Sequence, residues 1–428
     1  MPPRSNTRPP SDPPGVPARR AALRLLDAVL RRGLAIEQAL DNATSGLPPP
    51  DRGLAHAITA EVLRWLADLD SLIDSATRNR LADDAKARFV LRIALAQALR
   101  LGTPPHAAIS TALPLVDGGP RKLVHGVFGT LMRGNAALPD LPTLPEAVAA
   151  RIAGNWGERV AQAAAAAIAV PPPLDLTLRG VSAIAGESLM PGHVRLTADV
   201  PVPQLPGYGE GEWWVQDLAA SLPARLLGSG SGRALDLCAA PGGKTLQLSA
   251  TGWDVTAVDI SQSRLARLSE NLERTGLSAQ VVTADLMKWE PGFEADAVLL
   301  DAPCSATGIF RRHPDVLHRV RPRVVAEMAE LQAALLPRVA RWVRPGGLLV
   351  YATCSLEPEE GERQIERFLS DHAEFAIDRV MADELPDGLV AHERGWLRTL
   401  PGMLAEHGGL DGFFIVRLMR VAGDSRAA

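Results

Sequence analysis

From about residue 213 onward, the chain alternates short apolar runs with amphipathic helical segments. Turn residues bound the apolar runs, which include "RALDLCAAPGGKT", "WDVTAVDIS" and "ADAVLLDAPCS". Strands that are joined by helices and buried on both faces are typical of parallel sheets. The alternation therefore predicts a doubly wound α/β domain with a mainly parallel sheet over residues 213–422.

The chain before this domain follows a helical pattern. Over residues 17–139, leucines recur at spacings of three and four, as Leu23, Leu26 and Leu30 do, which places them on one helix face. This pattern predicts an all-α bundle. Residues 1–16 are rich in Pro, Ser and Arg and cannot bury much apolar surface, so we expect a disordered tail there.

A shorter region, residues 140–212, joins the predicted helical bundle to the predicted α/β domain. It contains the alanine-rich stretch "AQAAAAAIAVPPP", in which prolines end a helix, and the alternating runs "LDLTLRG" and "HVRLTADVP". These features predict a small α+β connecting domain.

Charge is unevenly distributed along the chain. The formal net charge of −4 argues against nucleic-acid binding by the whole surface, but residues 1–140 hold 18 Arg and Lys against 13 Asp and Glu. Arg20, Arg24 and Arg31 form a strip on the first predicted helix. A solvated helix face is one interpretation of this strip, and a nucleic-acid contact is the other.

Composition and spacing also argue against two classes of protein. No apolar run reaches the roughly 18 uncharged residues of a membrane span, and "MPPRSNTRPPSDPPG" lacks the apolar core of a signal peptide, so we expect a cytoplasmic protein with no membrane partner. The three cysteines show no CxxC spacing and no nearby pair of histidines, so we expect neither a metal site nor a disulfide scaffold.

The stretch "ALDLCAAPGGKT" places a loop of small residues between a predicted strand and a predicted helix. Glycines let the backbone approach a ligand closely, and a helix start offers unpaired N–H donors, so the loop could bind a nucleotide. It matches neither GxxxxGK[ST] nor GxGxxG, so the phosphate-loop and dinucleotide interpretations lack their usual support.

Two aspartates follow later strands, Asp259 in "AVDIS" and Asp285 in "TADL". Acids at the carboxyl ends of adjacent parallel strands point into the crevice where such sheets bind ligands, and a carboxylate there can bind both hydroxyls of a ribose. A single aspartate after a strand is often a helix N-cap. The series, together with the acid before the small-residue loop, favours a ligand site.

Cys304 in "DAPCSATG" and Cys354 in "YATCSLEPEE" follow the fourth and fifth predicted strands. Those strand ends are neighbours in an open parallel sheet, so we expect both thiols at one crevice. A free cysteine is most often a small buried side chain, and two close thiols could also form a disulfide or a redox pair. Without CxxC spacing, and beside features of an adenosine site, the pair favours nucleophilic chemistry.

The motifs "DLCAAPGGKT", "DAPCSATG", "RRHPD", "ATCS" and "DGFF", in this order, resemble those of the S-adenosylmethionine-dependent RNA cytosine-5 methyltransferases of the RsmB/NOP class. This resemblance covers residues 212–420. The whole-chain layout resembles the bacterial 16S ribosomal RNA methyltransferase B branch, in which a NusB-like helical RNA-binding bundle, here residues 19–135, precedes the catalytic domain. The resemblance implies a Rossmann-like fold, S-adenosylmethionine as cofactor and RNA as partner.

The resemblance also implies roles for individual residues. Cys354, in the "TC" pair, is the nucleophile, and Cys304, in the "PC" pair, assists release. Asp259 binds the ribose hydroxyls, and Asp285 lies by the adenine. The methionine side of the cofactor site consists of Cys238, Ala239, Ala240, Pro241, Gly242, Gly243 and Lys244.

The implied chemistry explains the need for two thiols. C5 of cytosine is a poor nucleophile until a thiolate, here Cys354, adds at C6. Asp301, also expected at the cofactor, would hydrogen-bond to N3 if protonated, and Cys304 would act as, or position, the base that removes the C5 proton. Lys244, one of four lysines in the chain, could stabilise the thiolate, although chance also explains its place.

Arg311 and Arg312 follow the Cys304 loop, where they could bind RNA phosphates or have a structural role. We expect the protein to make 5-methylcytidine in 16S ribosomal RNA, with no obligate protein partner. Two alternatives remain open, namely the same chemistry on transfer RNA or another ribosomal RNA site, and a non-catalytic NusB-like RNA-binding or assembly factor.

Overall fold

The computed structural model describes residues 12–197 and 201–422. The predicted tail over residues 1–16 lies largely outside the described residues, and the first helix begins at Val16. The chain forms two compact units. They are the helical unit, which comprises the described residues up to Ala149 together with His313–Arg319, and the sheet unit, which comprises Ala150–Arg312 and the described residues from Val320 onward.

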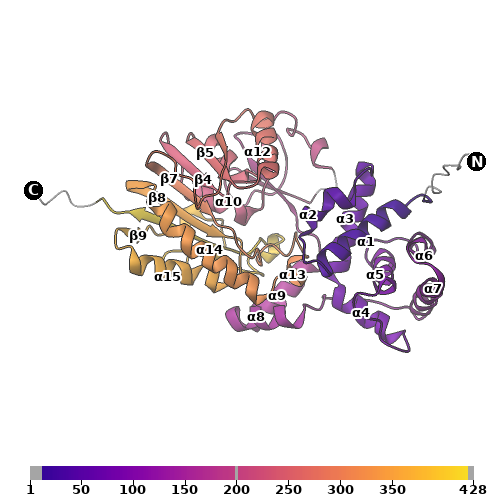
Figure 1. The fold of residues 1–428 in the computed structure, drawn as a ribbon. Coiled ribbons are helices and arrows are strands. Elements are labelled where there is room, and N and C mark those ends of the chain that lie inside the picture. Colours follow the sequence, from indigo (N-terminus) through magenta and orange to yellow (C-terminus); the bar gives the residue numbers. More distant parts are fainter. Residues whose placement is uncertain (1–11, 198–200, 423–428) are drawn as a thin grey trace, which may run out of the picture. The chain divides into compact units, whose positions relative to one another are not determined.

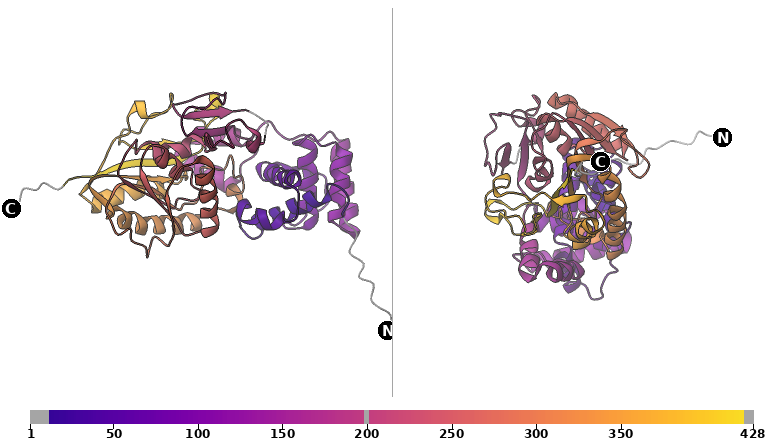
Figure 2. Two further views of the ribbon diagram at one scale, coloured as in Figure 1. Left: turned by 90° about the horizontal axis from the view of Figure 1, so that it is seen from above. Right: turned by 90° about the vertical axis from the view of Figure 1, so that its left-hand side faces the viewer.

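Helices α1 to α7 build the helical unit, drawn in indigo and purple in Figures 1 and 2. Helix α1 buries Leu26 in the core of this unit and packs Leu23 and Leu30 against it, as their spacing predicted. The segment His313–Arg319 adds the short helix α13 (Val316–Arg319). The other helices are α1 (Val16–Leu30), α2 (Ile36–Ala43), α3 (Pro49–Arg64), α4 (Leu66–Ser75), α5 (Lys86–Leu99), α6 (Pro105–Ala112) and α7 (Gly118–Arg133).

A small antiparallel sheet with the order β2-β1-β3 precedes the main sheet. Leu176 in β1 pairs with Val194 in β2 and with Val215 in β3, so the small sheet continues past the predicted boundary at residue 212. The division between the two units falls after Ala149, within α8. The predicted boundary lies earlier, at residue 139. The elements are α8 (Glu146–Trp156), α9 (Glu158–Ile168), β1 (Leu174–Leu178), β2 (His193–Leu196) and β3 (Trp213–Val215).

Within the described residues, the main sheet has eight strands, with the order β10-β11-β8-β7-β4-β5-β6 and β9 paired to β11. Strands β4 to β8 run parallel, which confirms the predicted mainly parallel sheet, whereas β9, β10 and β11 pair antiparallel. The strand order reverses between β4 and β7, and ligands of open α/β sheets bind at the carboxyl ends at such a point. The strands are β4 (Arg233–Leu237), β5 (Asp254–Asp259), β6 (Gln280–Thr283), β7 (Ala295–Asp301), β8 (Val343–Thr353), β9 (Phe375–Ile377), β10 (Leu397–Thr399) and β11 (Phe413–Arg420).

Helices cover both faces of the main sheet (Figure 1). On one face, α14 and α15 bury Leu336 and Ile365, and on the other, α10 and α12 bury Leu222 and Leu268. With both faces covered, the loops at the strand ends are left to carry functional side chains. The helices are α10 (Leu218–Arg225), α11 (Gly243–Ala250), α12 (Gln262–Thr275), α14 (Pro322–Ala340) and α15 (Glu362–Asp371).

Candidate active site

Two thiols meet at the carboxyl ends of β7 and β8. These strands are parallel neighbours, and Asp301 at the end of β7 pairs with Ala352 in β8. The loops that follow therefore begin at the same level of the sheet, and the Sγ atoms of Cys304 and Cys354 lie 3.3 Å apart. The structure thus brings together the two thiols that were expected at one crevice.

The surroundings of the two thiols differ in charge. The hydrogen bond with Cys354, burial, and the negative charges of Glu360 and Asp301 raise the pKa of Cys304 well above its usual value. Burial alone would lower the pKa of Lys244, but Asp301 and Cys354 are among the neighbours that raise it overall. Two carboxylates therefore act on Cys304, and the Lys244 ammonium interacts with Cys354.

The loop of small residues after β4 contains two left-handed backbone positions. Cys238 has a φ of 60° and Gly242 a φ of 108°. A Cβ atom at Gly242 would come within 2.3 Å of Leu268 Cδ1 in α12, so this position requires glycine. Helix α11 begins directly afterwards, at Gly243, and its first N–H groups have no partner within the helix. Main-chain donors are therefore available where a ligand can approach the backbone.

The carboxylate of Asp259, at the end of β5, fixes this loop from the neighbouring strand. It accepts hydrogen bonds from the N–H groups of Ala240, at 3.1 Å, and Ser261, at 2.8 Å. Asp285 follows β6 and accepts a hydrogen bond from the N–H of Met287, at 2.9 Å. Both aspartates lie at the carboxyl ends of parallel strands, as expected, and their contacts to a cofactor stay predictions.

Lys244 links the small-residue loop to the end of β7. Its Nζ lies 2.7 Å from Asp301 Oδ2 and 5.7 Å from the centre of the Phe413 ring. In β4, the buried Asp236 accepts a hydrogen bond from Thr245 Oγ1, while its Oδ1 has no hydrogen-bond partner among the described residues. Burial raises the pKa of Asp236 to about 7. Lys244 and Asp301, to which the sequence analysis gave separate roles, thus form one ion pair.

A buried glutamate that the sequence analysis missed lies behind both thiols. Glu360, at the end of the short helix η3 (Pro358–Glu360), has no exposed surface. Its carboxylate accepts hydrogen bonds from the N–H of Ser305, at 2.8 Å, and from Ser355 Oγ, at 3.0 Å. These serines directly follow the two cysteines. The stretch "LEPEEGE" contains other glutamates, and no sequence pattern indicates which of them is buried.

Arg311 and Arg312 lie in a buried network of carboxylates. Arg312 Nη2 lies 3.0 Å from Asp217 Oδ2, and Arg312 Nε lies 3.6 Å from Asp411 Oδ2. Arg311 Nη1 lies 3.7 Å from the other oxygen of Asp411. Burial and the negative charge of Asp217 raise the pKa of Asp411 to about 7 despite both arginines. These contacts support the structural role, and a contact of the two arginines with RNA stays a prediction.

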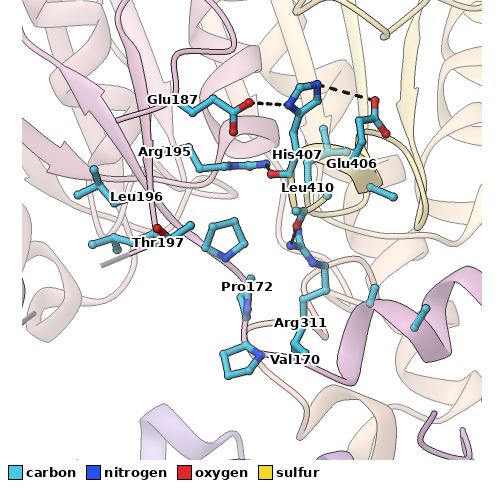
Figure 3. A pocket seen from close by; sticks show the side chains of 18 of the residues that line it. Val170, Pro172, Glu187, Arg195, Leu196, Thr197, Arg311, Glu406, His407 and Leu410 are labelled. Carbon is cyan, nitrogen blue, oxygen red and sulfur yellow. Dashed lines mark hydrogen bonds and ion pairs between the residues drawn. The ribbon is translucent and has the colours of Figure 1, made fainter. Parts of the chain in front are cut away.

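A separate cavity of about 1170 Å³ lies in the sheet unit. Figure 3 shows Arg195 and Arg311 beside it, with His407 bonded to Glu187. The guanidinium groups of both arginines donate to main-chain carbonyls, those of His407 and Gly408. Neither the cysteines nor the loop before α11 line this cavity, so it is distinct from the thiol site.

The predicted arginine strip lies on α1 of the helical unit. Arg20 pairs with Asp12 at 2.8 Å, and Arg31 pairs with Asp27 at 2.9 Å. Arg24 is exposed. The strip is therefore partly neutralised by neighbouring acids, and its contact with RNA stays a prediction.

Among the described residues, no group of three or more His, Cys, Asp or Glu side chains is arranged to hold a metal ion. No helix in residues 12–197 and 201–422 is long and apolar enough to cross a membrane.

Similar proteins have the same organisation. The family described as "16S rRNA methyltransferase RsmB/F" matches residues 226–419, and the NusB family matches residues 16–131. Ribosomal RNA small subunit methyltransferase B of Xylella fastidiosa (strain Temecula1) is 36% identical over 95% of this chain and 98% of its own, and the protein of that name from Klebsiella pneumoniae subsp. pneumoniae is 33% identical over 94% and 98%. The crystal structure of PH0851 superposes with a TM-score of 0.72 at 21% identity, over 96% of this chain and 100% of that chain, and so has the same fold.

Proposed function

The chain belongs to the ribosomal RNA small subunit methyltransferase B family, and from this premise we propose that it transfers a methyl group from S-adenosylmethionine to C5 of a cytosine in 16S ribosomal RNA. The reaction passes through a covalent bond between Cys354 Sγ and C6 of the base and yields 5-methylcytidine. The observation that carries this proposal is the pair of thiols, Cys304 and Cys354, 3.3 Å apart after adjacent parallel strands.

The cofactor site in this proposal lies at the strand-order reversal between β4 and β7. Residues 238–244 would hold the methionine end, Asp259 would bind the ribose hydroxyls, and Asp285 would lie beside the adenine. The left-handed backbone of this loop and the unpartnered Oδ1 of Asp236 among the described residues fit a polar ligand held close to the main chain. When bound, the cofactor supplies an electrophilic methyl group.

Cys354 is the nucleophile in this proposal. C5 of cytosine becomes reactive only after a thiolate has added to C6. The hydrogen bond with Cys354, burial, and the negative charges of Glu360 and Asp301 favour the protonated form of Cys304, and the ammonium group of Lys244 interacts with Cys354. In this proposal the attacking thiolate is that of Cys354, and the Cys304 thiol lies within hydrogen-bonding distance of it, 3.3 Å away.

Cys304 acts after the methyl group has been transferred. C5 then carries both the methyl group and a hydrogen, and this proton must leave before the bond between C6 and sulfur can break. Once Cys354 is bonded to C6, it no longer bears the negative charge that raises the pKa of Cys304. Cys304 then releases its own proton to solvent more easily, and the resulting thiolate accepts the proton from C5. The electrons of the C5–H bond restore the C5=C6 double bond and expel Cys354 as a thiolate.

Asp301 contacts N3 of the base in this proposal. Addition of a thiolate to C6 places negative charge on the ring, and a proton donor near N3 stabilises this charge. The 2.7 Å contact between Lys244 Nζ and Asp301 Oδ2 places a carboxyl group and an ammonium proton side by side. As negative charge moves from the Cys354 sulfur to the ring, the Lys244 proton would pass to Asp301, whose carboxylic acid would then donate to N3.

Tritiated S-adenosylmethionine tests the proposed reaction. The protein is incubated with this cofactor and, in separate reactions, purified 16S ribosomal RNA or transfer RNA, and the digested nucleosides are separated by chromatography. Label in 5-methylcytidine is expected, and the Cys354→Ala variant should give none. Label in transfer RNA alone would keep the chemistry and change the substrate. No label in either RNA, with no binding of the cofactor, would contradict the proposal and favour a non-catalytic RNA-binding factor.

A further inference from the structure

We propose that Glu360 is a positioning residue that holds the two thiols at their working separation. It would do so by bonding to the residue that follows each cysteine. This inference rests on the proposed methyl transfer and adds to it a residue to which neither the family motifs nor the chemistry assigned a role.

The carboxylate of Glu360 joins the two cysteine loops directly. Its Oε2 accepts hydrogen bonds from the N–H of Ser305, at 2.8 Å, and from Gln332 Nε2, at 3.0 Å. Its Oε1 accepts hydrogen bonds from the hydroxyl groups of Ser305 and Ser355. A carboxylate offers about four acceptor positions on its two oxygens. All of them are needed here to connect both loops with α14.

The same network also holds the residues before the cysteines. Gln332 Nε2 donates to the carbonyl oxygen of Pro303 at 2.8 Å, directly before Cys304. The carbonyl oxygen of Glu360 accepts hydrogen bonds from Tyr351 OH, at 2.8 Å, and Thr353 Oγ1, at 3.3 Å, which lie in β8 before the second cysteine. Each cysteine is therefore held on both sides by hydrogen bonds that lead to Glu360.

The proposed reaction depends on this spacing. The first thiol bonds to C6 and the second must reach the proton on the adjacent carbon C5, so the two sulfurs must be held where both can reach neighbouring atoms of one base. A displacement of about 1 Å at a reacting group can lower a rate by roughly a hundredfold. A buried carboxylate that bonds both loops can keep this separation constant through the catalytic cycle.

Two substitutions separate the reach of this side chain from its charge. Glu360→Asp keeps the charge and withdraws the carboxylate by one methylene group. Glu360→Gln keeps the length of the side chain and loses its charge. The amide oxygen can still accept from the Ser305 N–H, and the amide NH₂ can donate to the serine hydroxyl groups, because a hydroxyl group can accept as well as donate. The matched control is Glu359→Gln, because the neighbouring Glu359 is on the surface, 2.7 Å from Arg363.

Positioning by hydrogen bonds predicts an unequal loss of activity. Glu360→Asp should lower kcat on the order of tenfold to a hundredfold with a nearly unchanged KM for RNA, whereas Glu360→Gln should stay within about threefold of the wild type. Glu359→Gln should equal the wild type. If Glu360→Asp were active and Glu360→Gln inactive, the charge would be the essential property and the proposal would be overturned. Full activity of both variants would also overturn it.

A second measurement reports the thiol separation without RNA. Diamide takes two electrons and two protons from a pair of thiols as it is reduced to the hydrazine, and it should join Cys304 to Cys354, a product identified by peptide mass spectrometry. Glu360→Asp should slow this reaction about tenfold, because the thiols no longer meet in one orientation. An unchanged rate would overturn the positioning role. Absence of methyl transfer by the wild type would instead refute the proposed function, so the two failures are distinguishable.

Discussion

Cys304 and Cys354 lie side by side among charged groups, and the proposed reaction gives each a separate task. The hydrogen bond with Cys354, burial, and the charges of Glu360 and Asp301 raise the pKa of Cys304, and the Lys244 ammonium interacts with Cys354. Opposite charges favour the ionised form of a thiol and like charges disfavour it. In the proposed mechanism, these neighbours keep a proton on Cys304, which acts only after Cys354 has attacked the base.

The buried Asp236 predicts a pH effect on stability. Its pKa in the folded protein is about 7, above the ordinary value of 3.8, because burial disfavours the carboxylate. Between these values the folded state keeps a proton that the unfolded state has released, so the free energy of unfolding falls as the pH rises from about 4 to 7.

Asp236→Asn should remove this contribution. In urea unfolding followed by tryptophan fluorescence, the free energy of unfolding of the wild type should fall between pH 5 and pH 7 by roughly 2 kcal/mol more than that of the variant. Asp411, whose pKa is also raised to about 7, is present in both proteins, so its effect of pH on the free energy of unfolding is the same in both. An equal fall in both proteins would show that Asp236 does not titrate in this range.

At the scale of elements, the ends of β7 and β8 are joined by close backbone contacts. Gly308 N–H donates to the Cys354 carbonyl at 2.9 Å, and Gly412 N–H donates to the Gly308 carbonyl at 2.9 Å. A Cβ atom at residue 308 would lie 1.9 Å from the Gly412 oxygen and 3.0 Å from the Cys354 oxygen. No side chain fits between these loops.

Gly308→Ala should therefore push the Cys304 loop away from Gly412, which precedes β11, and from the Cys354 loop. We expect methyl transfer to fall by roughly a hundredfold and the free energy of unfolding to fall by about 1–3 kcal/mol. Gly53→Ala is the control, since a Cβ there meets nothing within 4 Å, and it should leave activity unchanged and raise stability by about 0.5–1 kcal/mol. Equal activity of the two variants would show that the loops tolerate separation.

The strand-end positions of the cysteines and aspartates could be predicted from the sequence because strand periodicity and the rule for parallel sheets need only local pattern. The ion pair of Lys244 with Asp301 could not, because it joins residues 57 positions apart. The burial of Arg311 and Arg312 depends on partners from other loops, which no local pattern specifies. The burial of Glu360 could not be predicted for the same reason.

At the scale of the whole molecule, the chain contributes to the helical unit twice. The residues up to Ala149 form most of this unit, and His313–Arg319 returns to it from the middle of the sheet-forming sequence. Within the unit, His318 Nε2 lies 2.7 Å from the carbonyl oxygen of Leu63. A helix as short as α13 has no periodicity that could reveal this return in advance.

Arg24, exposed on α1, is expected to contact RNA phosphates. Arg24→Ala should weaken RNA binding severalfold and reduce the slope of log affinity against log salt by about 1, because one fewer counterion is released. Fluorescence anisotropy with labelled RNA over a salt series measures both quantities. Arg80→Ala is the control, because Arg80 is exposed but paired with Asp74 and Asp83. Identical salt slopes for the wild type and Arg24→Ala would exclude this contact.

In the proposed mechanism, Cys354 bonds to the base and Cys304 permits its release. This mechanism is tested most directly by incubating each Cys→Ala variant with S-adenosylmethionine and 16S ribosomal RNA and separating the products by denaturing electrophoresis. Cys304→Ala should retain RNA in a covalent complex, because the adduct forms and cannot be resolved, and Cys354→Ala should show no complex and no methyl transfer. A complex in Cys354→Ala, or the same behaviour in both variants, would contradict this division of roles.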